Sequence, residues 1–164
     1  MLQLVPLKET DAEDLAAFAR PIWLETFGAI LPQGEPEAEY LADLWQSPAA
    51  IRQQMSEGLA YFTIEINEMR AGYCAVRAEG VSLFISKIYL LSAYRGKGMG
   101  SETLQQLMRW GRRHGMRRAY LHVNVHNAQA IAAYQHNGFR NEEHVVTEVG
   151  NGYQADDFVM ARVI

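Results

Sequence analysis

The segment YRGKGMGS, residues 94–101, places three glycines at alternate positions between basic residues and a serine. A strand-like stretch, SKIYLL, leads into it, and a helical pattern follows it. The first N–H groups of a helix lack partners within the helix and carry a partial positive charge, so they attract anions. Glycine leaves these groups uncovered, while Arg95 and Lys97 add charge and Ser101 adds a hydroxyl. This chemistry predicts a phosphate site, most naturally one for a diphosphate.

Three phosphate-binding patterns can be compared with this segment. A Walker loop needs a lysine directly after its last glycine, and Ser101 stands there instead. A dinucleotide fingerprint needs the spacing G-x-G-x-x-G and an acidic residue about 20 positions later, and the segment has neither. The pattern [QR]-x-x-G-x-[GA] fits, with Arg95, Gly98 and Gly100. Taken alone, this match leaves open a glycine-rich turn without a ligand.

A second motif, NAQAIAAYQHNGF, spans Asn127 to Phe139, about thirty residues beyond the glycine loop. The arrangement N-x-x-A-x-x-x-Y-x-x-x-G-F after such a loop resembles the GNAT acyl-CoA N-acetyltransferases. The resemblance covers roughly residues 59–164. It implies an α+β chain with the GNAT fold, a mixed and mostly antiparallel sheet of six or seven strands flanked by helices and splayed at the cofactor slot. It also implies direct transfer of acetyl from acetyl-CoA to a primary amine in a ternary complex, without a metal.

The resemblance implies roles for individual residues. Tyr134 matches the tyrosine that acts as general acid near the thioester sulfur, with an aromatic packed in the core as the alternative. A main-chain amide near Leu90 would be the oxyanion donor. Asn127 would cap its helix and touch the pantetheine arm, or act as the cap alone. The cofactor-binding residues implied in this way are Ile88, Tyr89, Leu90, Arg95, Gly96, Lys97, Gly98, Met99, Gly100, Ser101, Asn127 and Tyr134.

The base that deprotonates the amine is not assigned by the sequence. Many relatives carry a carboxylate near the stretch LFISKIYL, where this chain has Ser86 and Lys87. Water chains, Glu25 or a histidine are the alternatives. His122, Asn124 and His126 lie close together along one predicted strand, but they have no acidic or thiol partners, so no metal site is expected.

Several segments are similar to the spermidine/spermine acetyltransferase branch of the family: WLETFG, EYLADLW, SKIYLL and YQADDFVMARVI. This resemblance implies a polyamine or another small amine as substrate, with Glu25 as a substrate-binding residue. A protein N-terminal or lysine acetyltransferase is an alternative, although the long stretch FGAILPQGEPEAEY would close the pocket against a peptide. A non-catalytic acetyl-CoA sensor is another. The resemblance also implies a homodimer as a partner state, because members of the family commonly form dimers.

Composition limits the class of protein. The 164 residues predict one GNAT domain over 1–164, with 49% hydrophobic and 21% charged residues. The net charge of −4 does not favour nucleic acid or an anionic membrane as a partner. One cysteine, Cys74, and an N-terminus without the features of a signal peptide predict a cytoplasmic protein.

Hydrophobic periodicity predicts the elements that must position these motifs. Strands are expected over residues 2–7, 59–66, 69–78, 81–91, 117–125, 139–149 and 153–164. Helices are expected over 14–30, 38–46, 47–58, 101–114 and 127–136. Pro21 is expected to break or kink the first helix, and PQGEPEAEY, residues 32–40, is expected to be a loop. The helix after the glycines should bury Leu104, Leu107, Met108 and Gly111.

Overall fold

The computed structural model describes all 164 residues and contains one seven-stranded sheet. The strands are β1 (Leu2–Pro6), β2 (Ala60–Ile66), β3 (Met69–Glu79), β4 (Ser82–Leu90), β5 (Arg118–Asn124), β6 (Arg140–Gly150) and β7 (Tyr153–Val163). The helices are α1 (Ala12–Phe27), α2 (Gly34–Trp45), α3 (Pro48–Ser56), α4 (Met99–Arg113) and α5 (Ala128–His136), with 3₁₀ turns η1 (Glu9–Asp11) and η2 (Ser92–Tyr94).

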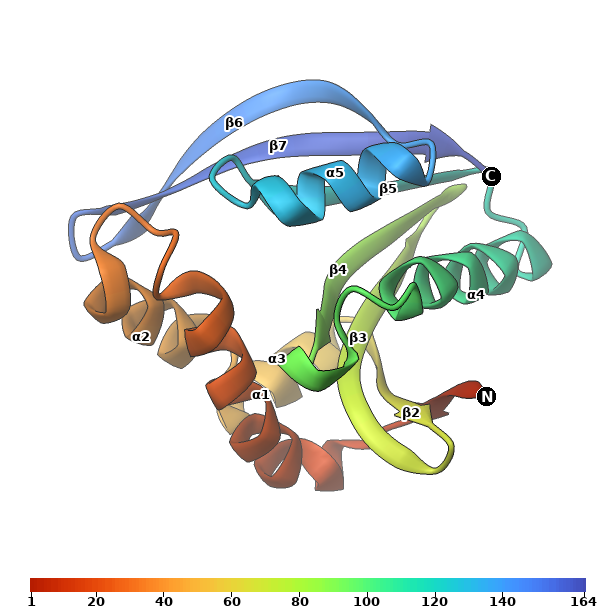
Figure 1. Ribbon diagram of the computed structural model, residues 1–164, viewed down its shortest axis with the longest axis horizontal. Helices are drawn as coiled ribbons and strands as arrows, with labels where there is room; N and C mark the ends of the chain where they lie inside the picture. The colour runs from red at the N-terminus through yellow and green to blue at the C-terminus, as the bar shows by residue number, and fades with distance from the viewer.

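The strand order is β1-β2-β3-β4-β5-β7-β6, and every neighbouring pair is antiparallel except β4 and β5. In Figure 1 the sheet divides into a lower part, β1 to β4, and an upper part, β5 to β7. This mixed, mostly antiparallel sheet flanked by helices is the GNAT fold that the two motifs predict.

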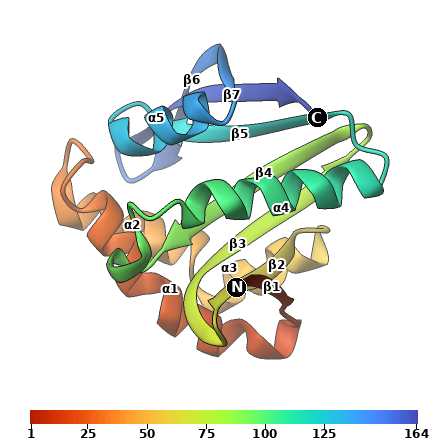
Figure 2. The ribbon, with the colours of Figure 1, turned by 45° about the vertical axis from the view of Figure 1, so that its right-hand side comes forward.

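Helices cover both faces of the sheet. On one face, α4 lies along the sheet, as Figure 2 shows, and packs with part of α5 on a core that includes Leu83, Ile85 and Leu121. On the other face, α1 and α3 pack against Tyr61 and Tyr73. The predicted buried face of α4 is confirmed, since Leu104, Leu107, Met108 and Gly111 are all buried.

The parallel pairing of β4 with β5 is short. It joins only residues 82–85 to residues 118–121. Beyond Ile85 the register between β3 and β4 shifts, because Ala75 pairs with Lys87 while Val76 pairs with Ile85, which leaves Ser86 as an extra residue. Such a bulge bends a strand and increases its twist. The end of β4 therefore turns away from β5 and opens a slot between the two parts of the sheet.

Two local expectations differ from the structure. Pro21 does not break α1, because buried residues on both sides of the proline, Ala19 and Ile22 among them, hold the two halves in one helix despite the lost hydrogen bond. The stretch 32–40 is not a loop throughout, since α2 already begins at Gly34. The buried Glu37 stabilises this start, because its carboxylate accepts a hydrogen bond from the Gln33 N–H at 3.0 Å.

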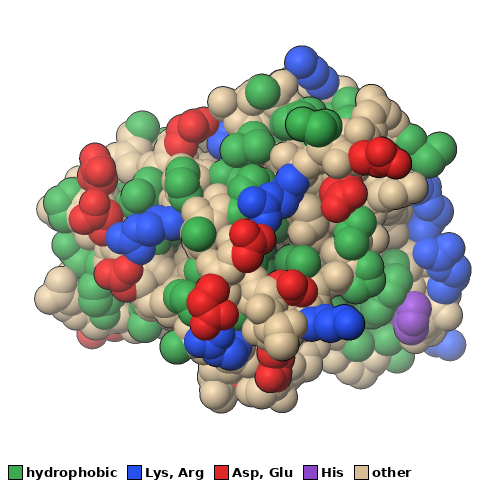
Figure 3. Space-filling view, turned by 90° about the horizontal axis from the view of Figure 1, so that it is seen from below, with side chains coloured by type: hydrophobic (Ala, Val, Ile, Leu, Met, Phe, Trp, Pro, Cys, Tyr) green, Lys and Arg blue, Asp and Glu red, His purple; other side chains and the backbone are tan.

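Acidic and basic side chains are interspersed over the face seen from below in Figure 3. Exposed ion pairs link α1 to its neighbours: Arg20 with Asp43, Arg52 with Glu13, and Arg70 with Asp14. Exposed pairs of this kind contribute little to stability, so α1 is held mainly by its apolar face. None of the helices has the length and apolar character needed to cross a membrane.

Candidate active site

The glycine loop joins β4 to α4 and exposes backbone at the helix start. Gly96 and Gly98 have φ angles of +73° and +81°, a region that side chains rarely tolerate. Gly100 lies inside the first turn of α4 with a negative φ, and an added Cβ would have no atom within 4 Å. Nothing in the protein itself therefore requires glycine at position 100. The free N–H groups of this turn and the open space above them fit an anion.

The last residues of β4 have an open edge toward β5. The N–H of Leu91 bonds to the Ala71 carbonyl on β3, so the alternating main-chain groups of Ile88 and Leu90 point the other way, into the slot. The carbonyl of Leu90 accepts from Arg95 Nε at 2.9 Å, which leaves its N–H free for a ligand. An extended arm with amide groups can pair with such an edge as an added strand would.

A cavity of about 630 Å³ runs through this slot. One mouth is lined by the glycine loop, Asn127 and Tyr134. The other lies on the opposite face of the sheet and is lined by Phe84, His122 and Asp157. The cavity therefore connects the two faces of the sheet.

Helix α5 presents Tyr134 to the cavity. The tyrosine packs against Phe139, with ring centroids 5.9 Å apart, and its hydroxyl makes no hydrogen bond within the protein. Burial raises the pKa of Tyr134 to about 12, so the hydroxyl is protonated at neutral pH and free to donate. The predicted helix cap is confirmed, because Asn127 Oδ1 accepts from the Ala130 N–H at 3.3 Å.

Asn137 fixes α5 relative to α4. Its Nδ2 donates to Ser101 Oγ at 3.0 Å and to the Ala133 carbonyl at 2.8 Å, while its Oδ1 accepts from Gln105 Nε2 at 3.3 Å. Asn137 therefore ties the glycine-loop helix to the helix that carries Tyr134.

Polar side chains lie at the second mouth of the cavity, the one lined by Phe84, His122 and Asp157, which we call the acceptor mouth. Asn124 pairs across the sheet with Asp157, and His122 lies two residues earlier on the same face of β5. Burial raises the pKa of Asp157, while the neighbouring His122 acts in the opposite direction. The ring of His122 also stands edge-on to Phe84, at a centroid distance of 5.9 Å. Asp157 is the one carboxylate that lines the cavity.

Arg95 is turned toward α1. Its guanidinium pairs with the Glu25 carboxylate at 2.8 Å and lies 3.4 Å from Thr26 Oγ1. Glu25 itself does not line the cavity, and its carboxylate is engaged by Arg95. Glu25 therefore helps to position Arg95, and Arg95 in turn donates a hydrogen bond to the Leu90 carbonyl.

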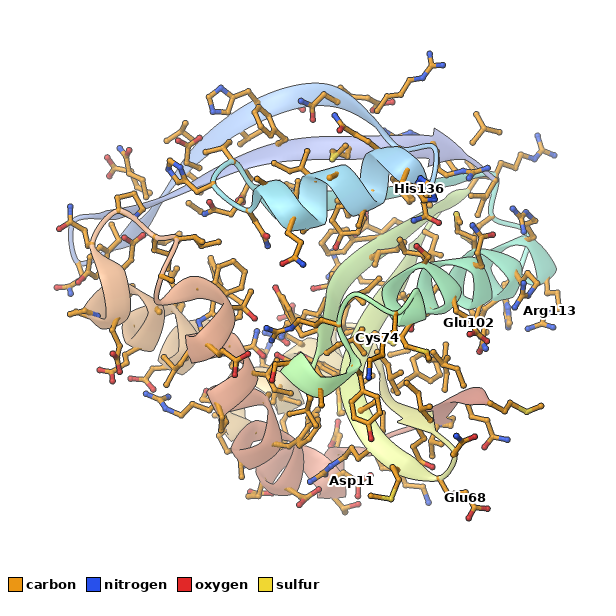
Figure 4. The ribbon with its side chains drawn as sticks, in the orientation of Figure 1. Asp11, Glu68, Cys74, Glu102, Arg113 and His136 are labelled. Carbon is orange, nitrogen blue, oxygen red and sulfur yellow. The ribbon has the colours of Figure 1, made fainter.

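The predicted cofactor residues fall into two groups. Lys97 and Met99 lie outside the cavity lining. The others line it: Ile88, Tyr89, Leu90, Arg95, Gly96, Gly98, Gly100, Ser101, Asn127 and Tyr134. No group of three or more His, Cys, Asp or Glu side chains is placed to hold a metal ion. Cys74 is fully buried in the core, and burial raises the pKa of its thiol (Figure 4).

Lys87 is a buried cation at the acceptor end of the cavity. It is 7% exposed, and its ammonium donates to the Trp45 carbonyl at 3.0 Å, to Gln54 Oε1 at 2.9 Å and to the Tyr61 hydroxyl. Burial lowers the pKa of Lys87 from its ordinary value of 10.5 to about 7. Sequence reasoning noted Lys87 only as the residue that replaces an expected acid.

Lys87 should make stability rise with pH. Between pH 7 and 9 the unfolded chain holds the Lys87 proton and the folded chain has lost it, so the free energy of unfolding should increase by about 2 kcal/mol. Urea unfolding at pH 7, 8 and 9 measures this increase. The variant Lys87→Met should remove it, whereas Lys97→Met, at an exposed lysine, should keep it. An unchanged slope in Lys87→Met would contradict the assignment.

A splayed sheet, with free helix N–H groups at one mouth of a through-cavity and a partly buried tyrosine beside the slot, is the architecture of an acyl-CoA-dependent acyltransferase. A model of the acetyltransferase (GNAT) family matches residues 19–139. The chain therefore belongs to the GNAT acetyltransferase family, which confirms the enzyme class predicted from the two motifs.

Three known proteins illustrate the likeness. Mycothiol acetyltransferase of Corynebacterium glutamicum is 40% identical over 68 residues, 39% of this chain but only 23% of that protein's length. The PaiA N-acetyltransferase of Thermoplasma acidophilum, solved in complex with coenzyme A, superposes with a TM-score of 0.79 at 20% identity, over 100% of this chain and 99% of that one. A mutant of the spermidine N-acetyltransferase SpeG from Vibrio cholerae superposes with a TM-score of 0.67 at 19% identity, over 99% of this chain and 93% of that one. At such identities the two structures show the fold alone.

Proposed function

We propose that the protein transfers acetyl from acetyl-CoA to a primary amine of a small molecule, by direct attack in a ternary complex. The observation that carries this proposal is the cavity through the sheet, which joins the glycine loop and Tyr134 on one face to His122 and Asp157 on the other. Direct transfer needs such a passage, because the two substrates must meet at one carbon atom.

The proposed reaction assigns a binding or catalytic role to each group of residues that lines the cavity. The N–H groups at the start of α4 hold the diphosphate of the coenzyme, and the open edge of β4 binds its amide-containing arm. The Leu90 N–H is the donor for the thioester oxygen as negative charge develops on it. The Tyr134 hydroxyl donates to the sulfur as the thiolate leaves. Asn127 and Ser101 complete the wall on that side.

His122 is the proposed proton acceptor for the ammonium group of the substrate. It lines the acceptor mouth, and the carboxyl of Asp157 on the neighbouring strand stabilises the imidazolium that forms. This assignment fills the role for which the sequence offered water chains, Glu25 or a histidine. Glu25 is the weaker choice, because it pairs with Arg95 outside the cavity.

The variant His122→Gln should lower kcat/KM for the amine about 30-fold at neutral pH and leave coenzyme A affinity unchanged, since a positioned base contributes about 10²- to 10⁴-fold when fully effective. The loss should shrink as the pH approaches 10, because the amine then loses its proton to solvent. Thiol release measured from about pH 6.5 to 10 tests this. His126→Gln, outside the cavity lining, is the matched control. Equal pH profiles for all three proteins would contradict the role.

A contact at the acceptor side favours a small substrate over a peptide. The Tyr40 hydroxyl of α2 donates to the Val149 carbonyl of β6 at 2.7 Å, and its ring lies 5.2 Å from that of Tyr153. Figure 1 shows the tip of the β6–β7 hairpin reaching α2. This contact bridges the side where an extended protein substrate would have to lie.

The test of the proposal is an acetyl-CoA assay with panels of polyamines, amino acids, other small amines and peptides, read as release of free thiol. Turnover of small amines without turnover of peptides supports the proposal. Tight coenzyme binding without turnover of any amine would identify a sensor instead. The panel also tests the polyamine acceptor implied by sequence, which the single lining carboxylate, Asp157, does not favour over other amines.

A further inference from the structure

The acceptor end of the cavity holds a lysine without a counter-ion, which is charged in about half of the molecules at pH 7 and in more of them below it. The three groups around the Lys87 ammonium, namely the Trp45 carbonyl, Gln54 and Tyr61, are all neutral, and no carboxylate lies within ion-pair distance. Arg77, which also lines the cavity, is paired with Glu79 at 2.5 Å. Lys87 is thus hydrogen-bonded but not neutralised, in a place where water cannot screen its charge.

A second donor beside Lys87 has no acceptor. Gln46 follows Trp45, whose carbonyl Lys87 binds, and it is 3% exposed and lines the same cavity. Its carboxamide oxygen accepts from the Tyr73 hydroxyl at 2.9 Å, while its Nε2 is buried without any hydrogen-bond partner. Buried polar atoms in folded proteins nearly always have partners, so an orphaned donor at a cavity points to a ligand.

The rest of this end is apolar. Trp23, Phe27, Leu31, Leu41 and Trp45 supply much of the wall. Lys87 lies three residues before Leu90 on β4, which corresponds to about 10 Å along a strand. The cavity therefore combines a reacting centre near Leu90 and Tyr134, an apolar wall, and an end with one unpaired donor and a lysine without a counter-ion.

Resting on the proposed function, we propose that Lys87 and Gln46 form a subsite for a carboxylate carried by the acceptor, which makes the substrate an amino carboxylate with its amine and carboxylate at opposite ends of an apolar chain. The carboxylate accepts the free N–H of Gln46 and, by displacing one of the three neutral acceptors of the Lys87 ammonium, pairs with its charge. A diamine of the same length would instead place a second ammonium against Lys87 in a poorly screened site. Since burial alone lowers the pKa of Lys87, a bound carboxylate would raise it again.

The first experiment compares acceptors that differ only at the far end. Omega-amino carboxylates from 3-aminopropanoate to 7-aminoheptanoate are assayed beside the monoamines and diamines of equal chain length. We expect one chain length at which the amino carboxylate exceeds its monoamine at least about 10-fold in kcat/KM, mainly through KM, with the diamine lowest. A diamine preference, or no difference between amino carboxylates and monoamines at any length, would overturn the subsite.

Two variants make the comparison specific. Lys87→Met should bring kcat/KM for the amino carboxylate to within about 3-fold of the value for its monoamine, both measured on the same variant. Arg77→Met is the matched control, because Arg77 lines the same cavity but is already paired with Glu79, and it should keep the preference. Loss of the preference in Arg77→Met and its retention in Lys87→Met would overturn the assignment.

A binding measurement does not depend on turnover. Trp23 and Trp45 line the subsite, so carboxylates without an amine, such as pentanoate and hexanoate, should change the tryptophan fluorescence of the protein saturated with coenzyme A. The wild-type protein alone answers the question if Lys87→Met does not fold. No response to any carboxylate, with coenzyme A bound and small amines acetylated, would remove the subsite and keep the proposed function. Failure to bind coenzyme A would remove the proposed function itself.

Discussion

Replacing Gly100 with valine should weaken coenzyme A binding about 100-fold without destabilising the protein. In the structure an added Cβ at this position meets no atom within 4 Å, and valine is at least as good a helix former as glycine. The only cost expected is therefore in ligand binding, where the side chain would keep a diphosphate from the N–H groups of the first turn of α4. A charge-assisted hydrogen bond is worth about 1.5–3 kcal/mol, and losing one or two gives the expected factor.

Calorimetric titration with coenzyme A measures the affinity, and thermal unfolding without ligand measures stability. Glu102→Val is the matched control, because Glu102 lies exposed in the same turn of α4 (Figure 4) and the same side chain is introduced there. Its affinity should be unchanged or slightly higher, since a negative charge near the phosphates is removed. If Gly100→Val bound coenzyme A as tightly as the unmodified protein, the diphosphate would have to lie elsewhere.

Replacing Tyr134 with phenylalanine should reduce kcat about 100- to 1000-fold and change coenzyme A affinity little. The hydroxyl has no partner in the protein, and burial keeps it protonated, so its removal breaks no native hydrogen bond. A donor aimed at charge that develops in the transition state typically contributes this much to the rate. Steady-state thiol release and calorimetry with coenzyme A separate the effect on kcat from the effect on binding.

The matched control is Tyr120→Phe, which removes a hydroxyl that donates to Glu79 outside the cavity lining. Its activity should stay within a few-fold of the unmodified enzyme. Full activity in Tyr134→Phe would show that the tyrosine only fills space between α5 and Phe139. A loss of coenzyme binding equal to the loss of rate would assign Tyr134 to binding instead of catalysis.

Much of the fold and one half of the candidate site could be predicted from local sequence. Periodicity predicts the strands and the helix that follows the glycines, and Ser47, whose residue type favours the cap position, accepts a hydrogen bond from the Ala50 N–H at 3.2 Å at the start of α3. Whether Pro21 breaks α1 or only kinks it was left open by the sequence, and the early start of α2 was missed. Both depend on packing against other elements, Ala19 and Ile22 in the first case, and in the second on Glu37, whose carboxylate caps the helix from a buried position.

The sequence by itself determined the coenzyme side of the protein. Glycines at 96 and 98 have positive φ, and the helix N–H groups of α4 and the cap at Asn127 follow from residues a few positions apart, so a linear motif contains their geometry. Such features are local, and the chemistry they predict does not depend on how distant segments pair.

The tertiary structure alone decided the acceptor side. His122 and Asp157 come together through the register of β5 with β7, and the bulge at Ser86 turns Lys87 toward Trp45 and Gln46 at the end of α2. His122 and Asp157 are 35 positions apart, and Trp45 and Lys87 are 42 positions apart. No local spacing in the sequence therefore predicts these contacts. The lysine without a counter-ion, the orphaned donor and the apolar wall of the proposed subsite exist only once the sheet has paired and the helices have packed on it.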